Sequence, residues 1–177
     1  MLTLDRFPSL PPVTEDKPTL RENAVKKAAQ TSRFTELLVL ADDSGLEVLA
    51  LGGRPGVRSA RFAGPLQDSR ANIAKLLRLL RSAPSSRRKA RFVCVLALAK
   101  NGRLLRTFRG ACDGVIAARP AGRAGFGYDP IFIPQGYGKT LAELGTKAKD
   151  GLSHRTRAVA RLKRWLQPGG SKIKTSF

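Results

Sequence analysis

The sequence Leu37-Leu38-Val39-Leu40-Ala41 is followed immediately by Asp42-Asp43-Ser44-Gly45. Five consecutive apolar residues predict a strand buried on both faces, as in a parallel sheet that helices cover on either side. We expect the two carboxylates at the carboxyl end of that strand, where open α/β sheets bind their ligands. Because neighbouring strand residues point to opposite faces, only one of Asp42 and Asp43 can lie well inside a given cleft.

These polar residues have two interpretations. An Asx-type turn that closes a strand uses the same residue types. Alternatively, carboxylates beside the Ser44 hydroxyl and the unhindered backbone of Gly45 suit a hard divalent cation and a phosphate-bearing substrate. The four residues alone do not decide between the two.

Composition predicts a globular protein of one domain. The 177 residues are 42% hydrophobic and 26% charged, so we expect a single domain over residues 1–167 and a flexible basic tail over residues 168–177. No apolar run reaches the length of a membrane span, and the N-terminus lacks the order of a secretory signal, which favours a cytoplasmic protein without membrane contact. Cys94 and Cys112 lack metal-ligand spacing, and a single histidine does not suit an all-protein zinc site.

The formal charge of +20 allows attraction to nucleic acid or to any other polyanion, including a nucleoside triphosphate. A general basic bias of the proteome is the alternative and is the interpretation that we favour, because many arginines fall on predicted solvent faces of helices. Examples are Arg78, Arg81, Arg87, Arg88, Arg161 and Arg164.

A capping-box pattern at Thr19-Leu20-Arg21-Glu22 predicts a helix from there to about Thr31. Lys27 falls on the apolar face of this helix. It is either a lysine that snorkels to the solvent or a residue that faces a cleft.

The rest of the chain alternates between helical and extended patterns. We expect a helix at 69–81, strands at 91–99, 104–111 and 131–133, a hairpin turn at Asn101-Gly102, and a last helix capped by Ser153 with Val159, Leu162 and Leu166 pointing inward.

Two further motifs could carry binding chemistry. In Gly125-Phe126-Gly127-Tyr128-Asp129-Pro130, flanking glycines let the backbone present Phe126 for stacking on a flat base, and Asp129 could accept from its edge. A tight turn with a core aromatic is the alternative. Downstream, Lys149 precedes Ser153-His154-Arg155 at a helix start, where backbone amides and cationic side chains converge.

Taken in order, the motifs resemble the inosine triphosphate pyrophosphatase family, the house-cleaning dITP/XTP pyrophosphatases, from about Leu4 to Leu166. The segments that carry the resemblance are Ala-Asp-Asp-Ser-Gly-Leu at 41–46, Leu-Gly-Gly-Arg-Pro-Gly-Val-Arg-Ser-Ala-Arg-Phe-Ala-Gly at 51–64, Ala-Arg-Phe-Val-Cys-Val-Leu-Ala-Leu at 90–98, Gly-Phe-Gly-Tyr-Asp-Pro-Ile-Phe at 125–132, Gly-Lys-Thr-Leu-Ala-Glu-Leu at 138–144 and Ser-His-Arg at 153–155.

The resemblance implies Mg²⁺-dependent hydrolysis of dITP, ITP or XTP to the nucleoside monophosphate and pyrophosphate. It implies an α/β fold with an elongated mixed sheet, flanking helices and two lobes around a nucleotide cleft, usually in a homodimer. Asp43 would be the proton acceptor and a metal ligand, and Glu15 the second carboxylate near the metal. The substrate-binding residues would be Lys27, Ser44, Phe126, Gly127, Tyr128, Asp129, Lys149, His154 and Arg155.

The N-terminus departs from the family pattern. Family members begin with an apolar strand, a Thr/Ser-x-Asn-x-x-Lys phosphate-binding loop and a helix, and the sequence here starts with none of these. We expect that this βα unit is missing, either because the start codon is assigned too far downstream, which we favour, or because the protein is a truncated form. An inactive homologue, or a basic nucleic-acid-binding protein on the same scaffold, is the competing function; its nucleic-acid binding would be non-specific.

Overall fold

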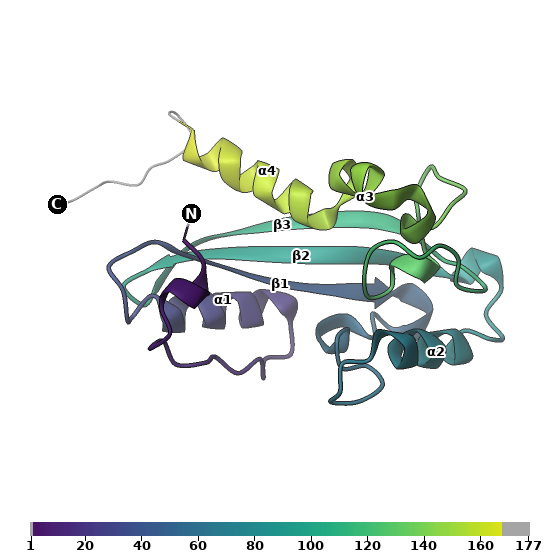
Figure 1. Cartoon of the computed structure of the whole chain (residues 1–177), viewed down its shortest axis with the longest axis horizontal. Coiled ribbons are helices and arrows are strands. Elements are labelled where there is room, and N and C mark those ends of the chain that lie inside the picture. The colour runs from purple at the N-terminus through teal and green to yellow at the C-terminus, as the bar shows by residue number, and fades with distance from the viewer. Residues whose placement is uncertain (1, 168–177) are drawn as a thin grey trace.

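The computed structural model describes residues 2–167, which form an elongated α/β structure around one antiparallel sheet (Figure 1). The strand order is β1-β2-β3-β4, so each strand pairs with its neighbour in sequence. The strands are β1 (Val39–Val48), β2 (Lys89–Lys100), β3 (Arg103–Ile116) and β4 (Phe132–Pro134).

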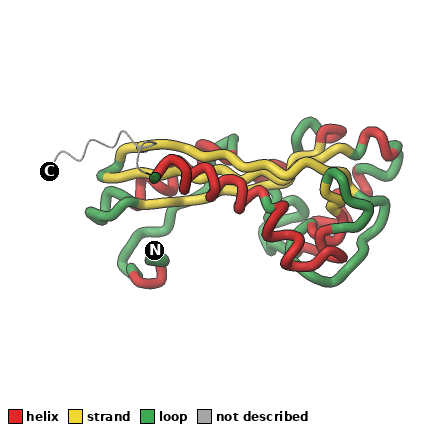
Figure 2. The backbone as a smooth tube through the Cα atoms, turned by 90° about the horizontal axis from the view of Figure 1, so that it is seen from above, coloured by secondary structure: helices red, strands yellow, loops and turns green. Residues whose placement is uncertain are grey.

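Two helices cover opposite faces of the long strands. The helix α1 (Leu20–Thr31) packs on one face, because it contacts the alternate residues Val93, Val95, Ala97 and Ala99 of β2. The helix α4 (His154–Leu166) packs on the other face, against the intervening Cys94, Leu96 and Leu98. Figure 1 shows α4 and α1 on the two sides of the strands, and Figure 2 shows α4 running along the sheet.

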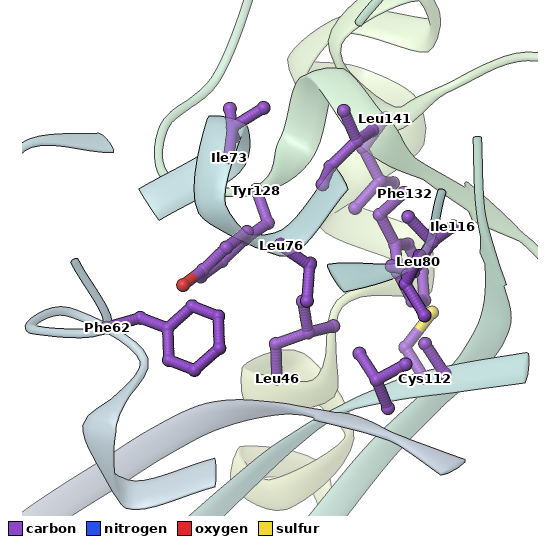
Figure 3. Packing of buried hydrophobic residues seen from close by; sticks show 13 residues of the cluster. Leu46, Phe62, Ile73, Leu76, Leu80, Cys112, Ile116, Tyr128, Phe132 and Leu141 are labelled. Carbon is purple, nitrogen blue, oxygen red and sulfur yellow. The ribbon is translucent and has the colours of Figure 1, made fainter. Parts of the chain in front are cut away.

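A third group of buried residues lies at the far end of the sheet, between α2 (Ser69–Leu79) and α3 (Leu141–Leu152). Figure 3 shows Leu46 of β1 beside Leu76, with the rings of Phe62 and Tyr128 at the rim of this cluster. The two clusters on the faces of the long strands form one core region, and the third cluster forms a second region at the far end of the sheet. This division agrees with the expected two lobes.

Local sequence signals account for the helix starts. Thr19 accepts from the Glu22 backbone N–H at 3.1 Å, Asp68 caps α2, and Ser153 caps α4. Asn101 and Gly102 adopt positive φ values of 50° and 78°, as the predicted β2–β3 hairpin turn requires. The predicted helices and hairpin are therefore confirmed.

Three expectations about packing are wrong. The described strands pair antiparallel throughout, so neither a parallel sheet nor the mixed sheet of the family pattern is present in residues 2–167. The strand begins at Val39 rather than at Leu37, and Leu37 and Leu38 are 46% and 50% exposed. Among the described residues, β1 is the edge strand. Leu166 is also exposed, at the last turn of α4.

Arg88 differs from the other arginines named above, since it does not lie on a solvent face. It is half-buried and donates to the carbonyl oxygens of Leu80, Ala83 and Ala117. Its role is to join the end of α2 to the end of β3.

Candidate functional site

The acidic residues lie in the middle of β1 and not at its end. β1 continues through Asp42, Asp43, Ser44 and Gly45 to Val48, which excludes the Asx turn and corrects the predicted position at a strand terminus. The extended backbone places adjacent side chains on opposite faces of the sheet. Asp43 lies on the α1 side, near Lys27, and Asp42 lies on the α4 side, near Arg155. The prediction that only one of the two acids can enter a given cleft is confirmed.

On the α1 side, one ammonium group joins two carboxylates. Lys27 Nζ lies 2.6 Å from Glu15 Oε1 and 3.6 Å from Asp43 Oδ1, and Arg61 approaches the other Glu15 oxygen at 3.7 Å. We call Glu15, Lys27 and Asp43 the acidic cluster. Lys27 faces this cluster from α1, which explains its place on the apolar side of the helix.

The Asp43 carboxylate is incompletely satisfied. Its Oδ1 accepts from the Ser44 backbone N–H at 3.2 Å, whereas Oδ2 is buried and has no hydrogen-bond partner among the described residues. Burial raises the pKa of Asp43, the nearby Lys27 ammonium lowers it, and the Glu15 charge raises it further. The result is a carboxylate of increased basicity with a free oxygen.

On the α4 side, a pocket of about 290 Å³ lies between β1, α2 and the start of α4. It brings together most of the residues that the sequence marked for binding the substrate. Seven of them line it: Ser44, Phe126, Gly127, Tyr128, Asp129, His154 and Arg155.

The aromatic groups of the pocket differ in exposure. Phe126 is 65% exposed, so its ring is accessible for stacking. His154 is buried and stacks on Phe92, with 5.1 Å between ring centroids and 12° between planes.

The polar groups at this edge of the pocket share one acceptor. Arg155 pairs with Asp42 through Nε at 3.2 Å, and Ser44 Oγ lies 3.4 Å from the same Asp42 oxygen.

Tyr128 and Asp129 hold the loop in place. The Tyr128 hydroxyl donates to the Ser59 carbonyl at 2.9 Å, its ring belongs to the core (Figure 3), and burial raises its pKa. Asp129 is almost fully buried, and its Oδ2 accepts from the Phe126 N–H at 2.8 Å. One oxygen of Asp129 thus fixes the turn that exposes Phe126.

Gly45 is required where the loop after β1 crosses the strand. A Cβ on Gly45 would clash with the Gly56 carbonyl oxygen and lie 3.0 Å from Ser59 Oγ. Ser59 Oγ in turn accepts from the Leu46 N–H at 2.8 Å, on the free edge of β1. A side chain at position 45 would displace this loop and the rim of the pocket.

The residues of this loop were not assigned a role from sequence. Asn72, which is buried, accepts from the Ala63 N–H at 2.6 Å and donates to the Ala60 carbonyl at 2.8 Å. Arg61 reaches Glu15 from the same loop. Ser59 and Arg61 belong to the motif at 51–64 that carries the family resemblance. The motif therefore marked this loop, but the spacing of its residues did not indicate a role for either side chain.

Asp43 and Ser44 are neighbours in sequence but belong to different sites. The acidic cluster and the pocket lie on opposite faces of β1, and the described pocket is not lined by Glu15, Lys27 or Asp43. The free edge of β1 lies between the acidic cluster and the pocket. The Lys149 side chain lies outside the described part of the structure, so its predicted contact stays a prediction.

Two broader features complete the description of the chain. Within residues 2–167, no helix has both the length and the apolar character needed to span a membrane. The same residues contain no group of three or more His, Cys, Asp or Glu side chains placed to hold a metal ion. The predicted metal-binding role of Glu15 and Asp43 therefore stays a prediction.

Residues 1–165 match the model of the Ham1 family. The chain belongs to the Ham1 family. The dITP/XTP pyrophosphatases of Geobacillus kaustophilus and Geobacter sulfurreducens are 49% and 50% identical to this Ham1-family chain, over 96% and 92% of its length. The alignments cover 83% and 82% of those two proteins.

Solved structures agree with the Ham1 assignment. The Ham1 protein of Staphylococcus aureus has a TM-score of 0.85 at 40% identity, covering 92% of this chain and 83% of that one. The nucleoside-triphosphatase, or dITP/XTP pyrophosphatase, of Mycobacterium abscessus has a TM-score of 0.81 at 44% identity, covering 94% and 85%. These relatives confirm the predicted fold, the predicted family and its enzyme class, the nucleoside-triphosphate pyrophosphatases.

Proposed function

We propose that the chain hydrolyses deaminated purine nucleoside triphosphates, namely dITP, ITP and XTP, to the nucleoside monophosphate and pyrophosphate. The observation that carries the proposal is the division of β1 into two faces, with a base-sized pocket on one and a basic carboxylate beside an ammonium on the other. Relatives about half identical in sequence carry the name dITP/XTP pyrophosphatase. The activity would remove damaged nucleotides from the pool.

The pocket suits a planar base. Phe126 offers an exposed ring for stacking, and Arg155 and the amino end of α4 offer donors and positive potential. A 6-oxo group accepts hydrogen bonds, whereas the 6-amino group of adenine donates them. Donors that surround this position would be left unpaired by adenine, which disfavours its binding.

The triphosphate would then cross the free edge of β1 at Ser44 and reach the acidic cluster. There Lys27 would leave its carboxylate partners for phosphate oxygens and stabilise the charge that develops on the leaving pyrophosphate. Asp43, with its raised pKa and one unpartnered oxygen, would accept the proton of the attacking water. Arg61 could take part in phosphate contact from the loop.

The acidic cluster also fits a magnesium ion. Mg²⁺ is bound typically by one or two carboxylates, with substrate phosphates and water as its other ligands. Asp43 Oδ2 and the Glu15 carboxylate provide that number of ligands. Bound there, the ion would neutralise phosphate charge and lower the pKa of the attacking water. The homodimer and the cytoplasmic location stay predictions from the resemblance and composition.

The decisive experiment measures pyrophosphate release from a panel of triphosphates, with Mg²⁺ or with EDTA. We expect release from dITP, ITP and XTP, at least about 100-fold less from dATP, and none with EDTA. Asp43→Asn should abolish this release, and Glu47→Gln is its matched control. Glu47 is another β1 carboxylate on the Asp43 face, and it pairs with Arg91. Equal turnover of dATP and dITP would overturn the assigned specificity, and orthophosphate as the product would overturn the reaction.

A further inference from the structure

A second charged surface lies at the other end of α4, away from the pocket. Three arginines, Arg106 on β3 and Arg161 and Arg164 on α4, surround Trp165 in an open groove of about 550 Å³. We call Arg106, Arg161, Arg164 and Trp165 the arginine patch. Ten residues of helix separate Arg155 from Trp165, which corresponds to about 15 Å along the axis. The arginine patch is therefore separate from the nucleotide pocket.

The charge of the arginine patch is not neutralised by its own elements. Segment 154–166 contains no aspartate or glutamate, and β3 contains one, Asp113, which lies outside the arginine patch. The ion pairs of the described residues involve other cations, such as Arg91 and Arg155, and none of the three patch arginines. Three like charges on one surface repel each other, and a bound polyanion would remove that repulsion.

The backbone of β3 orients part of the arginine patch. β4 pairs only with Gly114, Val115 and Ile116, so the earlier part of β3 has no partner strand on that side among the described residues. On this side of β3, which no described strand pairs with, Arg161 Nη1 donates to the Arg109 carbonyl at 2.8 Å. A guanidinium has five N–H donors, so Arg161 keeps donors for a ligand.

Trp165 provides an aromatic surface among these charges. Its ring lies 5.6 Å from that of Phe108, and the Arg106 guanidinium carbon lies 5.9 Å from its centroid. Exposed aromatic rings beside basic grooves bind the bases of single-stranded nucleic acids, while arginines bind the phosphates. Trp165 is half-buried, so part of its surface is open to such stacking.

We propose that the arginine patch binds single-stranded nucleic acid, with phosphates on the three arginines and a base against Trp165. Guanidinium groups match phosphate oxygens in a two-pronged geometry. An acidic protein segment would use the charges alone and would leave the tryptophan without a role. We expect the binding to be independent of sequence, because a stacked ring accepts any base and the arginines would contact phosphates.

The test uses the tryptophan itself, since Trp165 is the single tryptophan of the chain. A single-stranded oligonucleotide of about 20 residues is titrated into the full chain while intrinsic fluorescence and the anisotropy of a label on the DNA are recorded. We expect quenching of Trp165 that parallels the anisotropy. The affinity should fall steeply between about 50 and 200 mM salt, as counterion release requires.

Two double variants with the same change in net charge distinguish binding at the arginine patch from attraction by the net charge of the whole protein. Arg106→Glu with Arg164→Glu reverses two patch arginines, whereas Arg78→Glu with Arg81→Glu reverses two exposed arginines near the end of α2. We expect at least about tenfold weaker binding in the first and less than about threefold in the second. Pyrophosphate release from dITP should be unchanged in both, which also shows that both fold.

Several outcomes would overturn the proposal. Equal losses in the two double variants would mean that only net charge matters. Binding without any change in Trp165 fluorescence would place the nucleic acid elsewhere. Heparin that binds as tightly as the oligonucleotide, and quenches equally, would show a general polyanion surface. Unchanged dITP turnover with no detectable oligonucleotide binding at low salt would reject this proposal and leave the proposed function intact.

Discussion

Asp42 and Asp43 are identical in chemistry and adjacent in sequence, yet they have different surroundings. Asp43 is almost fully buried, has one oxygen without a partner and has a raised pKa. Asp42 is exposed and forms a surface ion pair with Arg155. Exposed ion pairs contribute little to stability, whereas a buried carboxylate oxygen without a hydrogen-bond partner costs free energy in the folded state. A residue's face of the strand, more than its type, therefore decides its role.

The largest expected effect separates these two acids. Asp43→Asn should lower turnover of dITP by about 10³-fold, because it removes the proposed proton acceptor. Asp42→Asn should lower it by less than about fivefold, since it removes only a surface pair. Steady-state pyrophosphate release checks both. Comparable losses in the two variants would break the distinction between the faces.

The two cations of the proposed site, Lys27 and Arg155, also lie on opposite faces of β1 and should affect different kinetic constants. Lys27→Met should lower kcat for dITP by about 100-fold, because its ammonium would stabilise charge on the leaving group. Arg155→Met should mainly raise KM, by about tenfold, since it contacts the base side. Full kinetic curves for both variants provide the measurement. A kcat effect confined to Arg155→Met would reverse the assignment of the faces.

Phe126→Ala tests the pocket face alone. Loss of one stacked ring should raise KM for dITP by about 10-fold and leave kcat nearly unchanged, because stacking contributes about 1–3 kcal/mol per base. Phe34→Ala, at another exposed phenylalanine, serves as the control. An unchanged KM would remove Phe126 from the base site.

The smallest effect concerns stability and its pH dependence. The raised pKa of Asp43 means that the folded state holds the proton more tightly than the unfolded state. Wild-type stability relative to Asp43→Asn should therefore be equal at low pH and should fall as pH rises above about 3.9 towards the folded-state pKa. At pH 7 the variant should melt about 2–4 °C higher. Thermal unfolding across pH, with Glu47→Gln as control, measures this; a variant that melts lower at neutral pH would contradict the unpaired carboxylate.

Some elements were predictable because their signals are local. The Thr19 cap, the Asn101-Gly102 turn and the Ser153 cap act within a few residues, and all appear as expected. The loop at 125–130 was also identified correctly as a segment that exposes an aromatic ring. Its anchors, Asp129 to Phe126 and Tyr128 to Ser59, were not predictable, since the second joins residues 69 positions apart.

The direction of β1 pairing shows where sequence reasoning failed. An apolar run of five residues fits a parallel strand buried on both faces, but it also fits the half-exposed edge of an antiparallel sheet. The pairing of β1 with β2 in antiparallel register decides between them and carries the strand through Asp42 and Asp43 to Val48. Leu37 and Leu38 consequently lie before the strand and are exposed.

By itself, the sequence determined the helix starts, the hairpin, the alternation of the two acids and, through its ordered motifs, the family. These features depend on backbone propensities and on residues close along the chain. Only the tertiary structure decided that Glu15 and Asp43 share one lysine, that the pocket lined by Phe126 and Arg155 opens on the other face of β1, and that three arginines gather around Trp165. Such groupings depend on which strands pair and which faces the helices cover, and these are set by packing between residues far apart in sequence.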